Sequence, residues 1–222
     1  MKKFFEHLES FNGEDIFNPW FCSDNVNDLS GDSFKIRRRQ LEQYLNERKD
    51  AKYILLAEAL GYQGGHFSGI PMTSERILLG KMRHRSITPE HVFSGIKPER
   101  TSKPDIKSDG FTEPTATIVW ERLIKSGLDT KEFIFWNSFP WHPYDQKKGI
   151  LSNRTPSDNE LEKGIPILDE LINITNVKKV IAIGEKARKQ CKKTGIDAPT
   201  VRHPANGGAG KFREQIIKVI NG

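Results

Sequence analysis

Continuous apolar runs and helical hydrophobic periods alternate along this sequence. The apolar runs lack polar alternation, which is typical of strands buried on both faces of a parallel sheet. They lie at residues 51–58, 132–137, 179–184 and 199–202. Apolar positions three or four residues apart predict amphipathic helices at residues 35–48, 115–125, 159–172 and 185–193. This alternation predicts an α/β fold, a three-layer αβα sandwich with a central four-stranded parallel sheet.

Length and composition predict one domain that binds a polyanion. The 222 residues fit a single domain, 1–222, with an insertion at about 81–113, where prolines and charges interrupt the periodicity. Hydrophobic residues make up 36% of the chain, which is enough for a core and excludes global disorder. Lys and Arg number 35 against 29 Asp and Glu, a net charge of +6, so a polyanion is the first partner to consider.

The cysteines and the amino terminus set further expectations. Cys22 and Cys191 are too few for a disulfide framework or a four-thiolate metal site. The amino terminus has no apolar run of the length that a signal peptide or a membrane helix needs. We therefore expect a cytoplasmic monomer that uses no membrane, metal or organic cofactor.

Chemically useful side chains follow three of the predicted strands. A glycine-rich segment at 57–75 follows the first, Asn137 ends the second, and residues 202–213 with His203 follow the fourth. Taken alone, each has a structural explanation as a tight turn, a cap or a hydrogen-bonded histidine. In a parallel sheet, however, ligands bind beyond the carboxyl ends of the strands, so one shared crevice is expected. The amide of Asn137 offers the donor and acceptor that a nucleobase edge requires.

Together, these segments resemble the uracil-DNA glycosylase superfamily, most of all its thermophile-type branch. The motifs of that branch are Gly-Glu-Ala-Pro-Gly, Gly-x-Pro-Phe, an Asn-led motif followed by Asn-Arg-x-Pro, and His-Pro-Ser. In that order, the matches here are Ala57-Glu58-Ala59-Leu60-Gly61, Gly69-Ile70-Pro71-Met72, Asn137, Asn153-Arg154-Thr155-Pro156 and His203-Pro204-Ala205. The resemblance runs from about residue 53 to residue 212. It implies the fold of that family, DNA as partner and base excision as activity.

The resemblance implies three catalytic residues, His203, Glu58 and Asn137. Cleavage of the bond between base and deoxyribose leaves positive charge on the sugar and negative charge on the base. In the family's chemistry, His203 would donate a hydrogen bond to the base carbonyl oxygen, and Asn137 would read the Watson–Crick edge of the flipped base. Glu58 would hold the attacking water or offset charge on the sugar. The implied substrate-binding residues are Ala59, Gly61, Tyr62, Gly69, Met72 and Asn137.

The sequence departs from the family at three places. Ala59 stands where the best-known branch has a water-activating aspartate, so stabilisation of the leaving base must carry more of the rate. Met72 stands where an aromatic residue of the family stacks on the base, so a flexible thioether would contact the base in place of a rigid ring. The thermophile-type branch has a four-cysteine iron–sulfur cluster, but Trp141 occupies one aligned position and the amino-terminal pair is missing. We expect packing of Trp141 to replace the cluster.

Phosphate contacts are expected beside His203, where backbone amides and cations suit a DNA backbone. The residues assigned to DNA in this way are Pro204, Gly207, Gly208, Lys211 and Arg213. The basic residues of the insertion form a second candidate strip, although charge runs are usually solvated faces. They are Lys81, Arg83, Arg85, Lys97, Arg100, Lys103 and Lys107.

Three functional hypotheses follow. The first is a monofunctional DNA glycosylase, a hydrolase of N-glycosyl bonds that removes uracil or a related flipped base and leaves an abasic site, in repair or in defence against foreign DNA. The second keeps the enzyme class, but Met72 and the glycine-rich loop open the pocket to a deaminated purine or a bulky modified pyrimidine. The third is a catalytically weak nucleic-acid-binding protein, which Ala59 and the loss of the aromatic residue at Met72 favour and the retention of Glu58, Asn137 and His203 opposes.

Overall fold

A four-stranded parallel sheet forms the centre of the protein. The computed structural model describes residues 1–222. The sheet has the strand order β3-β2-β5-β6. Its strands are β2 (Tyr53–Ala59), β3 (Phe133–Phe139), β5 (Lys179–Ile183) and β6 (Thr200–Val201). The predicted strands and the three-layer α/β sandwich are confirmed. Every residue of β3 is buried, as the continuous apolar run predicts for a strand covered on both faces.

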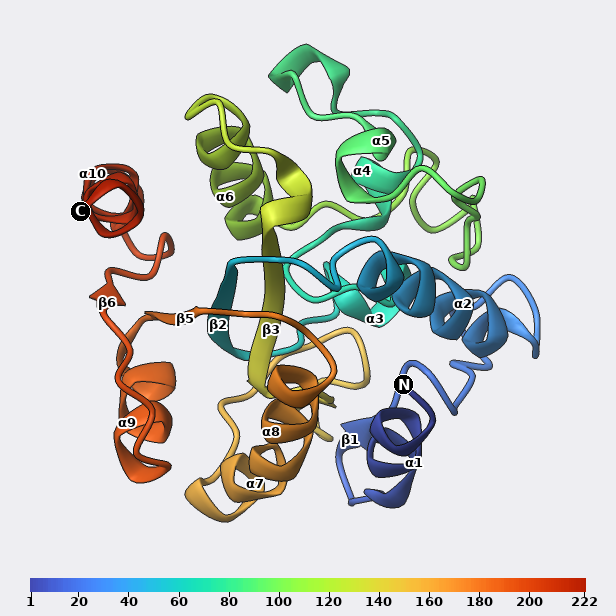
Figure 1. The fold of residues 1–222 in the computed structure, drawn as a ribbon. Helices are drawn as coiled ribbons and strands as arrows, with labels where there is room; N and C mark the ends of the chain where they lie inside the picture. The colour runs from blue at the N-terminus through green and yellow to red at the C-terminus, as the bar shows by residue number, and fades with distance from the viewer.

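Helices cover both faces of the sheet (Figure 1). Trp120 packs on Phe133 and Phe135, whereas Phe4 packs on Trp136. Because successive side chains of a strand point to opposite faces, the helices that carry Trp120 and Phe4 lie on opposite sides. In chain order, the helices are α1 (Lys2–Ser10), α2 (Ser33–Asn46), α3 (Gly65–Ser68), α4 (Glu75–Leu78), α5 (Pro89–Val92), α6 (Pro114–Ile124), α7 (Asp158–Lys163), α8 (Ile165–Asn173), α9 (Glu185–Lys193) and α10 (Ala209–Asn221). None of them has the length and apolar character needed to cross a membrane.

The predicted helices are present, except that the segment 159–172 forms two helices, α7 and α8. Gly164 separates them and lies against β3, since a Cβ atom there would come 1.8 Å from the carbonyl oxygen of Ser138. Pro166 in the first turn of α8 has no amide hydrogen with which to continue α7. The pattern also misses α1, α10, the one-turn helices α3, α4 and α5, and a short antiparallel ribbon of β1 (Ile16–Phe17) and β4 (His142–Pro143).

The segment at 81–113 contributes side chains to the core. The carboxylate of Glu75 accepts hydrogen bonds from the backbone amides of Thr101 and Ser102, at 2.7 and 2.9 Å, and so ties this segment to α4. Its buried apolar side chains include Met82, Ile87, Val92 and Phe93.

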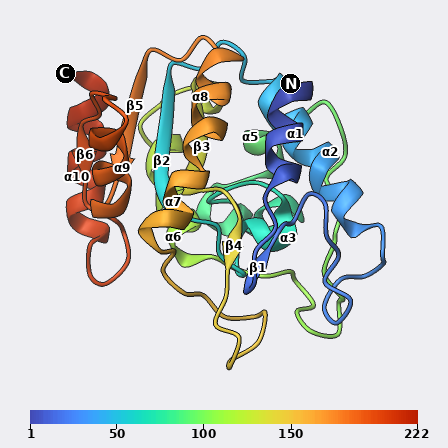
Figure 2. The same cartoon turned by 90° about the horizontal axis from the view of Figure 1, so that it is seen from below.

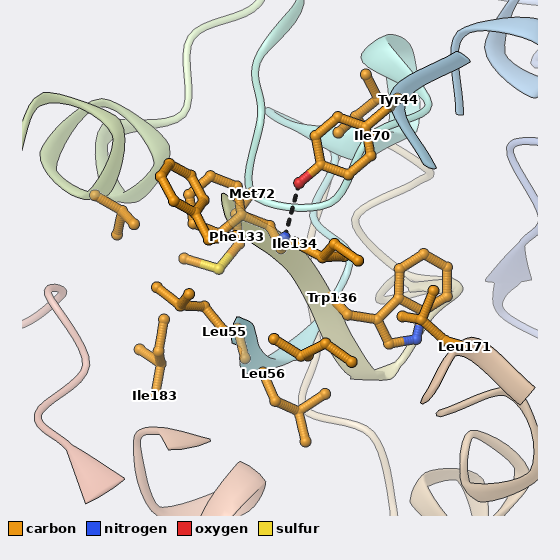
Figure 3. Packing of buried hydrophobic residues seen from close by; sticks show 14 of the residues in the cluster. Tyr44, Leu55, Leu56, Ile70, Met72, Phe133, Ile134, Trp136, Leu171 and Ile183 are labelled. Carbon is orange, nitrogen blue, oxygen red and sulfur yellow. Dashed lines mark hydrogen bonds between the residues drawn. The ribbon is translucent and has the colours of Figure 1, made fainter. Parts of the chain in front are cut away.

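A buried arginine, Arg48, connects the end of α2 to α5 and to the start of β3. Arg48 has no exposed surface and donates hydrogen bonds to five backbone carbonyl oxygens at 2.6 to 3.1 Å. Those carbonyls belong to Tyr44, His91, Val92, Thr130 and Phe133. Figure 3 shows the packing nearby, where the Tyr44 hydroxyl accepts a hydrogen bond from the backbone amide of Phe135 at 2.8 Å.

Loops gather where the strands end. Since the four strands are parallel, their carboxyl ends share one edge of the sheet. Figure 2 shows the loop after β4 and the loop between β6 and α10 extending beyond the same end of the molecule. This is the edge at which a ligand crevice is expected.

Candidate active site

A cleft of about 760 Å³ opens at the carboxyl ends of the strands. Glu58, near the end of β2, and His203, directly after β6, both line it. Ala59 and Gly61 line it as well. The structure therefore brings two of the three candidate catalytic residues together. The walls come from the segments 58–63, 113–118, 153–155 and 203–206.

His203 presents a neutral ring with a free donor. Its Nδ1 accepts a hydrogen bond from the backbone amide of Ala205 at 3.1 Å, so the neutral ring carries its proton on Nε2. Burial, and to a lesser degree the charge of Arg202, lowers the pKa of His203 below its ordinary value. A Cβ atom on Gly208 would come 2.0 Å from the carbonyl oxygen of His203, so glycine lets α10 begin directly against this loop. The Nε2–H group can donate to a ligand oxygen without adding charge.

Two loops of the cleft are bonded to each other. The backbone amide of Tyr62 donates to Oδ1 of Asn153 at 3.1 Å, and Gly61 lies beside the same side chain. Arg154, the next residue, makes a bidentate pair with Glu160 at 2.7 and 2.9 Å. The Asn-Arg-x-Pro segment thus fixes the glycine-rich loop after Glu58.

A buried histidine pair supports the same loop. Nε2 of His142 lies 2.7 Å from the carbonyl oxygen of Ser152, and its Nδ1 lies 2.9 Å from Nδ1 of His66. Nε2 of His66 lies 3.2 Å from the carboxylate of Asp24. Burial lowers the pKa of His142 to about 3 and also lowers that of His66. This chain anchors the residue that precedes Asn153.

Tyr62 does not line the cleft, although its neighbours Gly61 and Gln63 do, and three other expected binding residues are also absent from its walls. Asn137 pairs with Ala57 in the sheet and is only 1% exposed, and its side-chain oxygen has no hydrogen-bond partner. Met72 lies in the hydrophobic core, as Figure 3 shows, where its sulfur does not form a platform on the cleft. Gly69 faces α2, because a Cβ atom there would come 2.6 Å from the carbonyl oxygen of Arg37. The structure does not bring these three together with Glu58 and His203 in one cavity.

Glu113 lines the cleft and was not among the expected site residues. It directly precedes α6, and its carboxyl group lies against Gly64, where a Cβ atom would come 1.9 Å from Oε2. Burial raises the pKa of Glu113 to about 7. The sequence places it at the end of the insertion, and only its position before a proline-led helix could have drawn attention to it.

The raised pKa of Glu113 predicts a pH-dependent contribution to stability. The group binds its proton more tightly in the folded protein than at its ordinary pKa of 4.5 in the unfolded chain. Stability therefore falls as pH rises from about 4.5 through about 7. Glu113→Gln should remove this slope, leaving the variant more stable than the wild type by about 1 to 3 kcal/mol above pH 8. Urea unfolding at acidic and alkaline pH checks this, and parallel pH profiles for both proteins would contradict it.

The sequence behind this cleft matches a known family. Residues 82–220 match the family model described as the uracil DNA glycosylase superfamily. The chain belongs to this superfamily. A solved structure with a similar fold is the crystal structure of wild-type Pedobacter heparinus SMUG2, with a TM-score of 0.61 and 15% sequence identity over 99% of this chain and 96% of that one. No curated protein matches the sequence significantly.

Uracil-DNA glycosylase superfamily members are hydrolases of N-glycosyl bonds that act on DNA, and this chain lacks the cysteines for the iron–sulfur cluster of one branch. Cys22 is exposed and Cys191 is buried, and no group of three or more His, Cys, Asp or Glu side chains is arranged to hold a metal ion. At the aligned position, the ring of Trp141 lies with its centroid 4.5 Å from that of Phe11, at an interplanar angle of 40°, and its Nε1–H donates to the carbonyl oxygen of Leu8. The residues present do not fit the cluster.

The residues assigned to DNA in this glycosylase differ in exposure. Gly207 and Lys211 are exposed, Arg213 is partly buried, and Pro204 and Gly208 are buried. Lys211 and Arg213 are two residues apart on α10 and so point to different sides of the helix.

The basic strip of the segment 81–113 is partly neutralised by its own neighbours. Acidic side chains lie close to three of its members. The pairs are Lys81 with Asp109 at 3.5 Å, Arg83 with Glu90 at 3.8 Å and Arg85 with Glu121 at 2.5 Å.

Proposed function

We propose that the protein is a monofunctional DNA glycosylase that hydrolyses the N-glycosidic bond of uracil, or of a related damaged or modified base, and leaves an abasic site. The observation that carries this proposal is the neutral His203, with its free Nε2–H, on one cleft with Glu58. Membership of the uracil-DNA glycosylase superfamily supports DNA as the partner. A paired base cannot reach such a cleft, so base flipping is part of the proposal.

His203 and Glu58 serve opposite ends of the breaking bond. As the bond breaks, its electron pair moves to the base, and the Nε2–H of His203 donates a hydrogen bond to the carbonyl oxygen that takes up the charge. The carboxylate of Glu58 orients a water molecule towards the anomeric carbon or offsets the positive charge that develops there. Water is the nucleophile, so the reaction needs no lysine Schiff base.

Asn137 is proposed to read the edge of the base. Its side-chain oxygen is buried without a hydrogen-bond partner, whereas buried polar atoms are normally paired. A ligand group that donates to this oxygen would satisfy it. The amide nitrogen of the same side chain would then recognise an acceptor on the base.

The composition of the cleft supports the second hypothesis on the base as well. No Phe, Tyr or Trp side chain lines the cleft, so stacking on an aromatic ring does not restrict the base to a pyrimidine there. A deaminated purine or a bulky modified pyrimidine therefore belongs in the same substrate panel as uracil.

A substrate panel tests the proposed function. Labelled oligonucleotides carry uracil opposite guanine, opposite adenine or in a single strand, and others carry hypoxanthine or modified cytosines. After incubation with the protein, alkali cleaves each abasic site, and we expect scission at one or more of these bases.

Scission of none of these oligonucleotides would overturn the enzyme proposal and favour the nucleic-acid-binding hypothesis. Binding of the same oligonucleotides, measured by fluorescence anisotropy, would then support that hypothesis. We further propose that the protein acts as a cytoplasmic monomer in DNA repair, because its basic balance and two unpaired cysteines suit that setting.

A further inference from the structure

Where α6 begins, the wall of the cleft carries a carboxyl group, that of Glu113, with no structural role. Glu113 is the residue before the first turn of α6, yet its side chain makes no capping hydrogen bond to that helix. Only its backbone carbonyl oxygen is used, accepting from the amide of Thr117 at 3.1 Å. In contrast, the buried carboxylate of Glu75 is held by Thr101 and Ser102. Helix capping and loop anchoring therefore do not explain Glu113.

The chain makes space for this carboxyl group beside the substrate loop. Gly64 follows the glycine-rich turn after Glu58, and any side chain there would overlap Oε2 of Glu113. Thr115 and Ile118 line the cleft on the same wall. Glu113 thus faces the cleft from a helix terminus packed against the loop that resembles the first family motif.

No partner stabilises the ionised form of Glu113. The other titratable or charged groups on the cleft are Glu58, Arg154 and His203, and Tyr62 lies in the adjoining loop. Arg154 is committed to Glu160, and His203 is neutral at pH 7. His66 lies on α3, which begins after Gly64, but its ring contacts Asp24 and His142 and not Glu113. Burial raises the pKa of Glu113 to about 7, so the carboxyl group keeps its proton up to about neutral pH.

We propose that Glu113 is the general acid of this cleft and protonates the base as its bond to deoxyribose breaks, a role that rests on the glycosylase function proposed above. The electron pair of the C1′–N bond moves to the base, and the carboxyl proton of Glu113 moves to a ring nitrogen or carbonyl oxygen of that base. The water oxygen bonds to C1′, and its proton passes to Glu58. Glu58 then releases its proton to solvent and Glu113 takes one proton back from solvent, so the net reaction adds one water.

Glu113 acts as the general acid and Glu58 as the general base, as two carboxyl groups do in glycoside hydrolysis. Glu113 supplies a proton that His203 cannot supply, because the neutral imidazole of His203 donates a hydrogen bond but holds its Nε2 proton far too tightly to release it. Protonation of the leaving base also compensates for Ala59, which offers no carboxylate to the water.

The test is the pH dependence of single-turnover base release by the full-length protein. Wild type, Glu113→Gln and the control Glu42→Gln, an exposed position on α2, are compared on the best substrate of the panel from about pH 5 to about pH 9. We expect the wild-type and Glu42→Gln rates to fall above about pH 7. The Glu113→Gln variant should be about 100-fold slower at acidic pH and lack that fall. Glu113→Asp, which keeps the acid on a shorter side chain, should regain part of the rate and the pH-dependent fall.

Infrared difference spectra of wild type against Glu113→Gln add a readout that needs no substrate. A protonated carboxyl band that is present at about pH 6 and gone at about pH 8 supports the proposal. A carboxylate that is ionised at both pH values overturns it. Wild-type activity with the same pH profile in Glu113→Gln overturns the role of Glu113 alone, whereas a wild type inert towards every base overturns the glycosylase function and this role with it.

Discussion

His203→Ala is expected to slow base release by about 10² to 10³-fold, because the variant loses the hydrogen-bond donor aimed at the developing anion. His203 is neutral and its Nδ1 is occupied by the amide of Ala205, so its free Nε2–H is available to the leaving group. Single-turnover cleavage of the best substrate in the panel measures the effect. DNA affinity, measured by fluorescence anisotropy, should change little, since the lost interaction forms fully only in the transition state.

His84→Ala is the matched control for this prediction. His84 is exposed and lies outside the cleft, so its replacement should leave the rate unchanged. Equal rates for wild type and His203→Ala would remove His203 from the mechanism and leave the cleft without its donor.

Arg48→Ala is expected to lower the free energy of unfolding by about 3 to 5 kcal/mol. The substitution leaves five backbone carbonyl oxygens without their donor and opens a cavity between α2 and the sheet. Arg48→Lys should also destabilise the protein, because an ammonium group cannot reach acceptors that a planar guanidinium contacts from both ends. Urea unfolding followed by circular dichroism measures both variants.

An exposed arginine provides the comparison for Arg48. Arg188 on α9 pairs only with Glu185 in the same helix, and Arg188→Ala should leave the unfolding midpoint nearly unchanged. A similar midpoint for Arg48→Ala and Arg188→Ala would show that the buried hydrogen bonds add no net stability.

The sequence predicts those parts of the fold that local patterns determine. Apolar runs identify the four strands of the central sheet, since a strand covered on both faces needs apolar residues throughout. The helix split at Gly164 depends on contact with the carbonyl oxygen of Ser138, which is distant in sequence. Helix α10 is not predicted from the sequence because its first residues, Ala209 and Gly210, belong to a glycine-rich run.

The candidate site is predictable only where topology alone places a residue. Glu58 lies near the carboxyl end of β2 and His203 directly after β6, and these positions in one parallel sheet are sufficient to place both on one cleft. Asn137 also lies near the end of a strand, but its side chain is buried and does not line the cleft, which strand position does not reveal. Glu113 is missed because its environment depends on Gly64, a contact between segments that only the folded chain brings together.

The hydrogen bond between the Tyr62 amide and Asn153 has a consequence for protein engineering. It joins two loops, 91 positions apart in the chain, into one wall of the cleft. The bidentate pair of Arg154 and Glu160 holds one of these loops in place. A mutation in either loop would therefore disturb both. A library intended to change the preferred base is therefore better directed at Thr115, Ile118 and Asn206, which line the cleft outside these two loops and leave Glu113 and His203 in place.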